Sequence, residues 1–185
     1  MTAVISVELL DPSAAADAAL VERLTALVND VYAAAEDGLW RSGAARTTAA
    51  DMASLITAGQ IVVARVDGHL SGSVRVQALS DVTGEFGLLA ADPQQRGIGV
   101  GRELVAFAER HSMARGLRAM QLELLVPRTW SHPSKDFLDE WYRRMGYEVI
   151  RRTSVDDLQP ELAPLLATPC EFVVYEKPLN GSSGD

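Results

Sequence analysis

The chain has 185 residues, of which 48% are hydrophobic, and these values suit one sizeable core near the upper limit of a single domain. Its 17 basic and 25 acidic side chains give a formal net charge of −8, which repels nucleic acid phosphates and anionic lipid and favours a cationic partner such as a small amine. A single cysteine excludes an internal disulfide, and no apolar stretch approaches the roughly 20 residues that cross a bilayer. We therefore expect a cytoplasmic protein that binds neither nucleic acid nor membrane. A homodimer is compatible with the sequence.

The first third of the sequence predicts one strand and two helices. Residues 4–10 have the pattern of a strand, and Asp11 and Pro12 supply an N-cap and a first-turn proline for a helix that runs to about residue 36. Apolar side chains recur along that helix at three- and four-residue spacing: Leu20, Leu24, Leu27, Val28, Val31 and Tyr32. After a loop over 37–47, Thr48 and Asp51 are typical of a capping box that starts a short helix to about residue 58.

The rest of the sequence predicts a sheet interrupted by two helices. Strands over 61–66 and 70–79 are joined by the hairpin turn Asp67-Gly68. The second of them alternates between an apolar face and a wetter face that carries Ser71, Ser73, Arg75 and Gln77. Further strands are expected over 84–91, 117–126, 147–153 and 171–177, with helices to about residue 115 and over 134–145. We take 1–180 as one domain and 181–185 as a disordered tail.

The segment from Asp92 to Leu104 joins a buried strand to an amphipathic helix and carries alternating glycines. Gly97, Gly99 and Gly101 remove side chains where main-chain N–H groups must approach a ligand closely. The first turn of the helix also leaves N–H groups unpaired at the positive end of its dipole. The segment therefore suits a phosphate or pyrophosphate, and the structural alternative is a plain glycine-rich turn.

Two common phosphate-binding motifs do not fit this spacing. A Rossmann fingerprint needs glycine at the first, third and sixth positions, but the sixth position is Arg102 when counted from Gly97 and Leu104 when counted from Gly99. A P-loop needs Gly-Lys followed by Ser or Thr, and the sequence contains no such string. A nucleotide-binding protein of either kind is therefore not indicated.

The segment instead resembles the acyl-coenzyme A signature of the GNAT acetyltransferases, which is a Gln or Arg, two residues, Gly, one residue, then Gly or Ala. Arg96, Gly99 and Gly101 fill those places, and the expected order of elements from residue 4 to 177 is similar to the fold of that family. The resemblance implies an α/β fold with a central mixed, mostly antiparallel sheet flanked by helices in a single domain, and acetyl-coenzyme A as acyl donor. It also implies that cofactor binding involves Leu89, Ala90 and Ala91 along the pantetheine arm, Arg96 and Gly97 of the signature, and the main-chain amides of Ile98, Gly99, Val100, Gly101 and Arg102 around the pyrophosphate.

The implied reaction transfers an acetyl group to a primary amine by direct attack in a ternary complex, and it needs a base. An alkylammonium has a pKa of about 10 and no free lone pair at neutral pH. Glu85, on the strand that leads to the glycine turn, is similar in place to a glutamate that serves as general base in some family members. Glu123, on the expected strand 117–126, is a competing candidate, and an ordinary solvated or salt-bridged carboxylate is the structural alternative for either.

The departing thiolate leaves more easily beside a proton donor. The string from Glu140 to Tyr147 resembles the second motif of the family, and its tyrosine, Tyr142, is expected to protonate the thiolate; a half-buried packing role is the alternative. The chain departs from the family at Lys135, where an Asn often contacts the pantetheine. We expect either that Ser134 or Lys135 takes over that contact, or that Lys135 approaches a cofactor phosphate, or that Lys135 is a solvated lysine, which is the favoured alternative to the phosphate contact.

Loops that flank the expected cleft carry aromatic and polar side chains, and such loops commonly set specificity. We expect the acceptor to meet Trp40, Trp130 and His132 in addition to Glu123. No spacing of His and Cys indicates a metal site. The alternative to catalysis is a non-catalytic acyl-coenzyme A-binding or sensor domain on the same fold, against which Glu85 and Tyr142 both argue.

Overall fold

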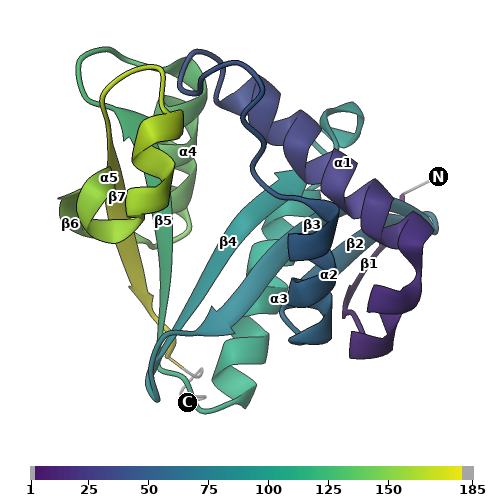
Figure 1. Ribbon diagram of the computed structural model, residues 1–185. Coiled ribbons are helices and arrows are strands. Elements are labelled where there is room, and N and C mark those ends of the chain that lie inside the picture. The colour runs from purple at the N-terminus through teal and green to yellow at the C-terminus, as the bar shows by residue number, and fades with distance from the viewer. Residues whose placement is uncertain (1–2, 181–185) are drawn as a thin grey trace.

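The computed structural model describes residues 3–180, and the tail expected to be disordered over 181–185 lies outside the described residues. Figure 1 shows a twisted sheet covered by helices on both faces. The described residues form strands β1 (Ile5–Leu9), β2 (Ile61–Val66), β3 (His69–Ala78), β4 (Thr83–Ala91), β5 (Ala119–Pro127), β6 (Glu148–Ser154) and β7 (Cys170–Pro178). Their α-helices are α1 (Ala18–Ala35), α2 (Ala49–Thr57), α3 (Val100–Ala114), α4 (Pro133–Arg144) and α5 (Val155–Leu158), and their 3₁₀ helices are η1 (Pro12–Ala16), η2 (Pro93–Gln95) and η3 (Pro160–Leu165).

The strands of the sheet follow the order β1-β2-β3-β4-β5-β7-β6, and every neighbouring pair is antiparallel except β4 and β5. The expected class, a mixed and mostly antiparallel sheet flanked by helices, is therefore confirmed. Within the described part of the chain, none of the helices combines the length and the apolar character that crossing a bilayer requires.

Two apolar clusters hold the helices on opposite faces of the sheet. On one face, α3 and α4 pack side chains such as Leu104 and Tyr142 against Val74 and Phe86. On the other face, α1 and α2 pack Leu24 and Ile56 against β2, and Figure 1 shows these two helices lying in front of the sheet. Each helix buries one apolar stripe against the sheet, so the stripes of α1 and α2 and those of α3 and α4 pack on opposite faces of it.

The first helix is divided, contrary to the single helix expected after residue 11. Asp11 accepts a hydrogen bond from the main chain of Ser13 and starts only the short η1. Asp17 then has an extended backbone, with ψ of 90°, and its carboxylate accepts a 3.0 Å hydrogen bond from Leu20 N, which caps α1. Two successive acidic caps break what the apolar spacing alone presents as continuous.

The face of β3 that was expected to be wetter is buried over its first half. Ser71 and Ser73 are each only 1% exposed. Ser73 pairs with Val63, which packs under α1 and α2, so these helices cover that end of the strand. Arg75 and Gln77 lie beyond this cover, and both side chains are only partly buried.

The segment between β6 and β7 contains α5 and η3, which the sequence analysis did not assign. Both are too short to show a helical period, and η3 contains Pro160 and Pro164. The segment packs Val155 and Leu166 against Leu125 and Phe172. The segment therefore lies beside the C-terminal half of β5.

The parallel pairing of β4 with β5 is short. Thr83–Glu85 pair with Ala119–Gln121, and beyond them each strand keeps only its outer neighbour, β3 or β7. The register of β4 against β3 shifts just after this pairing ends, between Gly87 and Ala90, where Leu88 has a positive φ of 49°. Such a bulge turns a strand locally, and here β4 parts from β5.

A close approach of α3 to the sheet requires glycine at position 72. A Cβ there would lie 2.7 Å from Val100 Cγ1 and 2.9 Å from the carbonyl oxygen of Ala90, both shorter than normal contacts. Gly72 therefore fixes the first turn of α3 against β3 and β4. This brings the glycine turn to the point where the strands part.

The Gly72→Ala variant should unfold more easily by about 1–3 kcal/mol, because either the helix or the strand must move to admit the methyl group. Gly87→Ala is a matched control on β4, since its Cβ would meet only Glu85 Oε1 at 3.9 Å. Urea denaturation followed by circular dichroism measures both. Equal stability of the two variants would show that the contact of α3 with Gly72 does not constrain the fold.

Candidate active site

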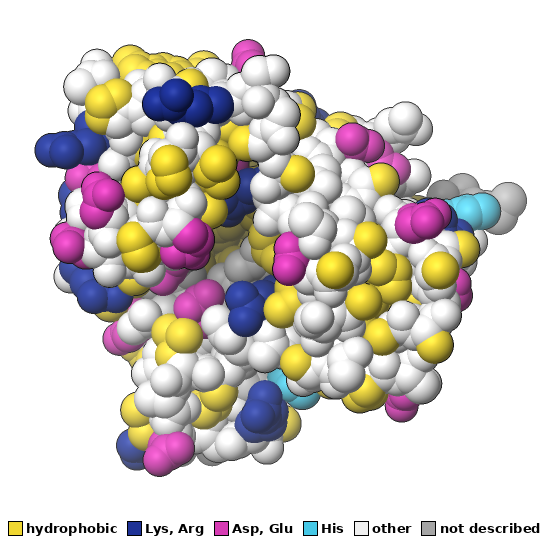
Figure 2. Space-filling view, viewed as in Figure 1, with side chains coloured by type: hydrophobic (Ala, Val, Ile, Leu, Met, Phe, Trp, Pro, Cys, Tyr) yellow, Lys and Arg dark blue, Asp and Glu magenta, His cyan; other side chains and the backbone are white. Residues whose placement is uncertain are grey.

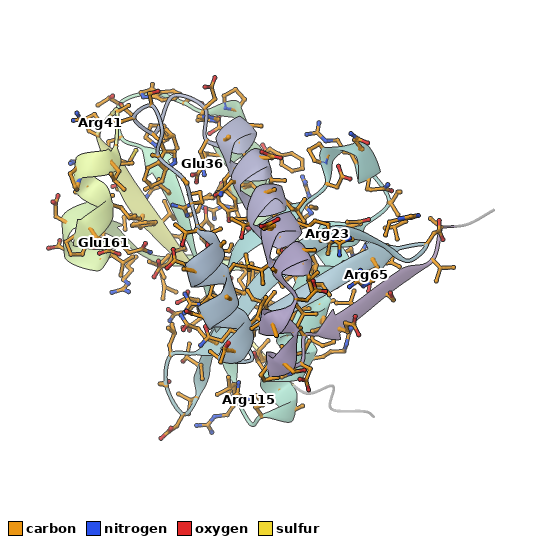
Figure 3. All side chains as sticks on the ribbon, turned by 45° about the vertical axis from the view of Figure 1, so that its right-hand side comes forward. Arg23, Glu36, Arg41, Arg65, Arg115 and Glu161 are labelled. Atoms are coloured by element: carbon orange, nitrogen blue, oxygen red, sulfur yellow. The ribbon has the colours of Figure 1, made fainter. Side chains whose placement is uncertain are left out.

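A cavity of about 1160 Å³ opens where β4 and β5 part. It is lined by residues of the first turn of α3, of α4, of the C-terminal part of α1, of α2, and of η3. Figure 2 shows a hollow in the middle of the face that carries α1, with acidic side chains along one border and hydrophobic and basic side chains within it. Glu36 follows the end of α1 and Glu161 lies on η3; both line the cavity, and Figure 3 shows them on separate segments of the chain.

The glycine turn forms the end of the cavity beside α3. Gly97 and Gly99 have φ of 85° and 100°, a region that favours glycine, and Gly99 is the N-cap of α3. The N–H groups of the following first turn have no partner within the helix and carry the positive end of its dipole. Arg96 and Arg102 also line the cavity here. This end therefore offers main-chain donors and positive charge to an anion.

Eight of the ten residues expected to bind the cofactor line the cavity: Leu89, Ala91, Arg96, Gly97, Gly99, Val100, Gly101 and Arg102. Ala90 and Ile98 do not. Ala90 is 1% exposed and packs in the cluster under α1, because alternate residues of a strand face opposite sides. Ile98 donates its N–H to Gln95 O at 3.4 Å inside the turn, so this amide is already used.

Two carboxylates face the cavity at the point where the strands part. Glu85 belongs to the last parallel pair, opposite Gln121, and Glu123 follows on β5. Gln77 Nε2 donates to Glu85 Oε1 at 3.5 Å, and Gln159 Nε2 donates to Glu123 Oε2 at 2.8 Å. Both candidate bases therefore occupy one site, each held by an amide.

Burial changes the acidity of both groups. Burial and, to a smaller extent, the negative charge of Glu123 together raise the pKa of Glu85 to about 6, against the opposing effects of the Gln77 hydrogen bond and the Arg75 charge. Burial also raises the pKa of Glu123, against the hydrogen bond from Gln159 and the charge of Arg151. Glu85 is thus ionised at pH 7 but more basic than an exposed carboxylate, as a general base requires.

Tyr142 lines the same cavity from α4. It is 5% exposed, and its ring packs against Phe86, Tyr147 and Tyr175 with centroids about 6 Å apart. Burial raises its pKa far above the ordinary value. The hydroxyl is therefore protonated across the neutral range and is available as a hydrogen-bond donor.

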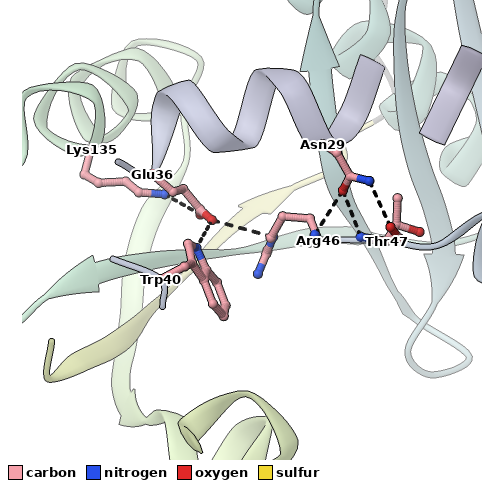
Figure 4. A network of polar contacts seen from close by, with 6 residues as sticks. All are labelled: Asn29, Glu36, Trp40, Arg46, Thr47 and Lys135. Carbon is pink, nitrogen blue, oxygen red and sulfur yellow. Dashed lines mark hydrogen bonds and ion pairs between the residues drawn. The ribbon is translucent and has the colours of Figure 1, made fainter. Parts of the chain in front are cut away.

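Lys135 is not the solvated lysine that we considered. Its side chain is 4% exposed, and Nζ lies 2.7 Å from Glu36 Oε1, as Figure 4 shows. The other oxygen of Glu36 accepts a 2.5 Å hydrogen bond from Trp40 Nε1 and lies 3.7 Å from Arg46 Nε. A buried ammonium needs a charged partner, and Glu36 supplies it from the end of α1. The partner is 99 residues away in sequence, which explains why local patterns missed it.

Three side chains expected to meet the acceptor lie outside the cavity lining: Trp40, Trp130 and His132. Trp40 serves the Glu36 network, and Trp130 is exposed and donates to Thr168 Oγ1 at 3.1 Å. His132 caps α4 by accepting from Ser134 N, and its Nε2 donates to the carbonyl of Asp37 at 3.0 Å. Of the four residues named for the acceptor, only Glu123 lines the cavity.

The cavity includes polar residues that the sequence analysis did not propose, among them Arg75, Gln159 and Glu161. Arg75 was noted only as part of the wetter face of its strand, and that alternation was the available signal. Gln159 and Glu161 come from the unassigned segment after β6. Among residues 3–180, no three His, Cys, Asp or Glu side chains are grouped so that they would hold a metal ion.

Comparison with known proteins agrees with this architecture. Ard1 from Thermoplasma volcanium aligns over 96% of this chain and 99% of its own, with a TM-score of 0.66 and 15% identity. The protein yncA from Salmonella typhimurium, solved with its cofactor acetyl-CoA, aligns over 98% of both chains with a TM-score of 0.63 and 13% identity. N-acetylglutamate synthase from Neisseria gonorrhoeae, complexed with coenzyme A and N-acetyl-glutamate, aligns over 98% of this chain and 36% of its own, with a TM-score of 0.62 and 17% identity.

At these identities the three structures show a shared fold. A search of curated protein sequences finds no match. The model of the acetyltransferase (GNAT) domain matches residues 57–149, which amount to half of the chain and include the parting strands, the glycine turn and α4. The chain therefore belongs to the GNAT acetyltransferase family.

Proposed function

We propose that this protein transfers an acetyl group from acetyl-coenzyme A to a primary amine by direct attack within a ternary complex. The observation that supports this most strongly is the continuity of the cavity. A single opening between β4 and β5 joins a helix terminus suited to an anion to two partly buried carboxylates. An acyl donor held at the first end and an amine held at the second would therefore meet where the strands part.

The residues present fit coenzyme A. Val100, Gly101 and Arg102 offer first-turn N–H groups for a pyrophosphate, and Arg96 adds a positive charge. Leu89 and Ala91 lie on the part of β4 that no longer pairs with β5, so their strand edge is open to an extended pantetheine arm. The cofactor supplies the acetyl group as a thioester.

Glu85 is the proposed base. It takes a proton from the incoming ammonium, either directly or through a water molecule, and thereby frees the lone pair of the nitrogen. Glu123 adds a second negative charge that holds the ammonium and makes Glu85 more basic. Tyr142 is the proposed donor toward the sulfur, because its protonated hydroxyl lines the same cavity and can hydrogen-bond to the thiolate as the carbon–sulfur bond breaks.

Gly101→Glu should weaken coenzyme A binding by at least about 100-fold, because a carboxylate at the first turn of α3 repels the pyrophosphate. An acidic residue is compatible with a helix N-terminus, so the fold should persist. Gly101→Ala is the matched control, since its Cβ would lie an ordinary 3.5 Å from the Trp141 ring. Calorimetry gives both dissociation constants, and equal affinities would place the pyrophosphate elsewhere.

Glu85→Gln should lower kcat/KM by about 10² to 10⁴ and abolish the acidic limb of its pH profile. In the wild type this limb should lie near pH 6, because kcat/KM falls as Glu85 gains a proton. Glu123→Gln should shift the limb to lower pH, since removing the neighbouring charge lowers the pKa of Glu85. If instead Glu123→Gln loses the rate and Glu85→Gln keeps it, the base is Glu123.

Tyr142→Phe should lower kcat by about 10² to 10⁴ and leave the coenzyme A dissociation constant nearly unchanged. A thioester analogue with a more acidic thiol is the control for the chemistry, because a better leaving group needs less protonation and should recover much of the rate. Steady-state kinetics with both donors tests this. A kcat within a few-fold of wild type with the natural donor would remove Tyr142 from the mechanism.

A further inference from the structure

An open space lies over Gly87, on the acceptor side of the cavity. Gly87 lines the cavity on β4, opposite Arg75 of β3 and two residues after Glu85. Apart from its chain neighbours, a Cβ built on Gly87 would have only Glu85 Oε1 within 4 Å, at 3.9 Å, so there is room above this glycine. The absence of a side chain at Gly87 leaves an opening beside the guanidinium of Arg75 and the carboxylate of Glu85.

Arg75 brings to this space a positive charge that is held by neutral amides and not by an ion pair. Its Nε donates to Gln60 Oε1 and its Nη2 to Gln77 Oε1, each at 2.8 Å, and both acceptors are neutral amides. Among the residues that the structure describes, no carboxylate forms an ion pair with it. The amides fix the orientation of the guanidinium without neutralising it. A partly buried arginine of this kind favours a carboxylate partner.

The other positive charges of the cavity are committed elsewhere. Arg46 and Lys135 both pair with Glu36, and Arg46 lies between the rings of Tyr32 and Trp40 at about 5 Å from each centroid. Arg96 and Arg102 belong to the α3 end. Arg75 is therefore the cation that an acceptor would meet beside Glu85.

We propose that the acceptor is a small zwitterion, of the class of free α-amino acids, whose carboxylate binds Arg75 while its amine faces Glu85 and Glu123. Arg75 and Glu85 are diagonal neighbours on paired strands, and the Gln77 side chain bridges them by accepting from Arg75 Nη2 at 2.8 Å and donating to Glu85 Oε1 at 3.5 Å. The two charged groups are therefore about one amide group apart, and a molecule that carries an amine and a carboxylate a few bonds apart can contact both from the open space over Gly87. This inference rests on the proposed acetyl transfer and names its substrate class.

The same arrangement disfavours polyamines and polycationic drugs as acceptors. A second ammonium would be attracted by the carboxylates along the cavity, which are Asp51, Glu123 and Glu161, but the guanidinium of Arg75 would repel it beside Glu85. A simple alkylamine would satisfy Glu85 and leave the guanidinium unpaired. Only an acceptor with a nearby carboxylate uses both charges.

Thiol release by the wild-type protein with matched acceptors is the first test. A panel of α-amino acids is compared with the corresponding α-carboxamides and with the decarboxylated amines. The free acids should show kcat/KM values about 10- to 100-fold higher, as expected for a charged hydrogen bond. The carboxamides carry a less basic amine and are more often unprotonated, so amine reactivity alone would favour them. Turnover of the amides or amines equal to that of the acids would overturn the inference while preserving acetyl transfer.

Variants of Arg75 separate recognition from structure. Arg75→Gln should reduce the preference for acid over amide by about 10- to 100-fold, whereas loss of packing would lower both rates together and leave the ratio unchanged. Arg75→Lys keeps the charge and should restore part of the preference. Arg65→Gln is the control, because Arg65 on β2 pairs with Glu8 on β1 at 3.7 Å and does not line the cavity. Figure 3 shows Arg65 far from Glu161 in that view. An unchanged ratio in Arg75→Gln contradicts the proposal.

Binding is measured separately so that failure of the proposed function remains distinguishable. Calorimetry of the coenzyme A-loaded protein with the same panel should show tighter binding of the acids. If no acceptor releases thiol but the acids still bind more tightly than their amides, the substrate class stands and the acetyl transfer fails. If the acids neither react nor bind preferentially, the proposal is wrong.

Discussion

The short parallel pairing of β4 with β5 is the constraint on which the rest of the structure depends. Three residue pairs join the strands, and after Glu85 they separate. A separation inside a sheet leaves main-chain N–H and C=O groups without a ladder, which is costly unless a ligand or solvent satisfies them. Here the separation creates the cavity and exposes the edge of β4 beside the first turn of α3. The anion site, the strand edge and the two carboxylates are consequences of one break in pairing.

A second constraint holds the cavity wall formed by α1 and α4. One buried carboxylate, Glu36, forms an ion pair with Lys135 at the start of α4. It also accepts a hydrogen bond from Trp40 and pairs with Arg46, both of which lie in the loop after α1. Asn29 fixes the same loop by accepting from the main chain of Arg46 and Thr47 and donating back to Thr47 O, as Figure 4 shows. Removing one partner of a buried ion pair typically costs about 3–5 kcal/mol, so these groups must be present together. The position where family members often carry an Asn thus has a structural role in this chain.

The sequence predicted features whose causes are local. The capping box of Thr48 and Asp51 forms as expected, and Asp67-Gly68 makes the hairpin turn with positive φ at both residues. The alternating glycines do begin a helix, with Gly99 as its N-cap. Each depends on residues within a few positions of one another, where side-chain chemistry and backbone preference act directly. The boundaries of the short helices were less predictable, because η1, α5 and η3 contain too few residues to show a period.

The sequence by itself determined the fold class, the glycine turn with its suitability for an anion, and Glu85, Glu123 and Tyr142 as candidates for chemistry. Only the tertiary structure decided which polar residues share the cavity. Trp40, Trp130 and His132 have the composition of a binding loop, yet their hydrogen bonds are used within the protein. Arg75 looked like an ordinary residue of a wet strand face, yet the register with Gly87 and the parting of β5 place it beside Glu85. The physical reason is that charge pairing and burial depend on contacts between residues far apart in sequence, which periodicity and spacing do not encode.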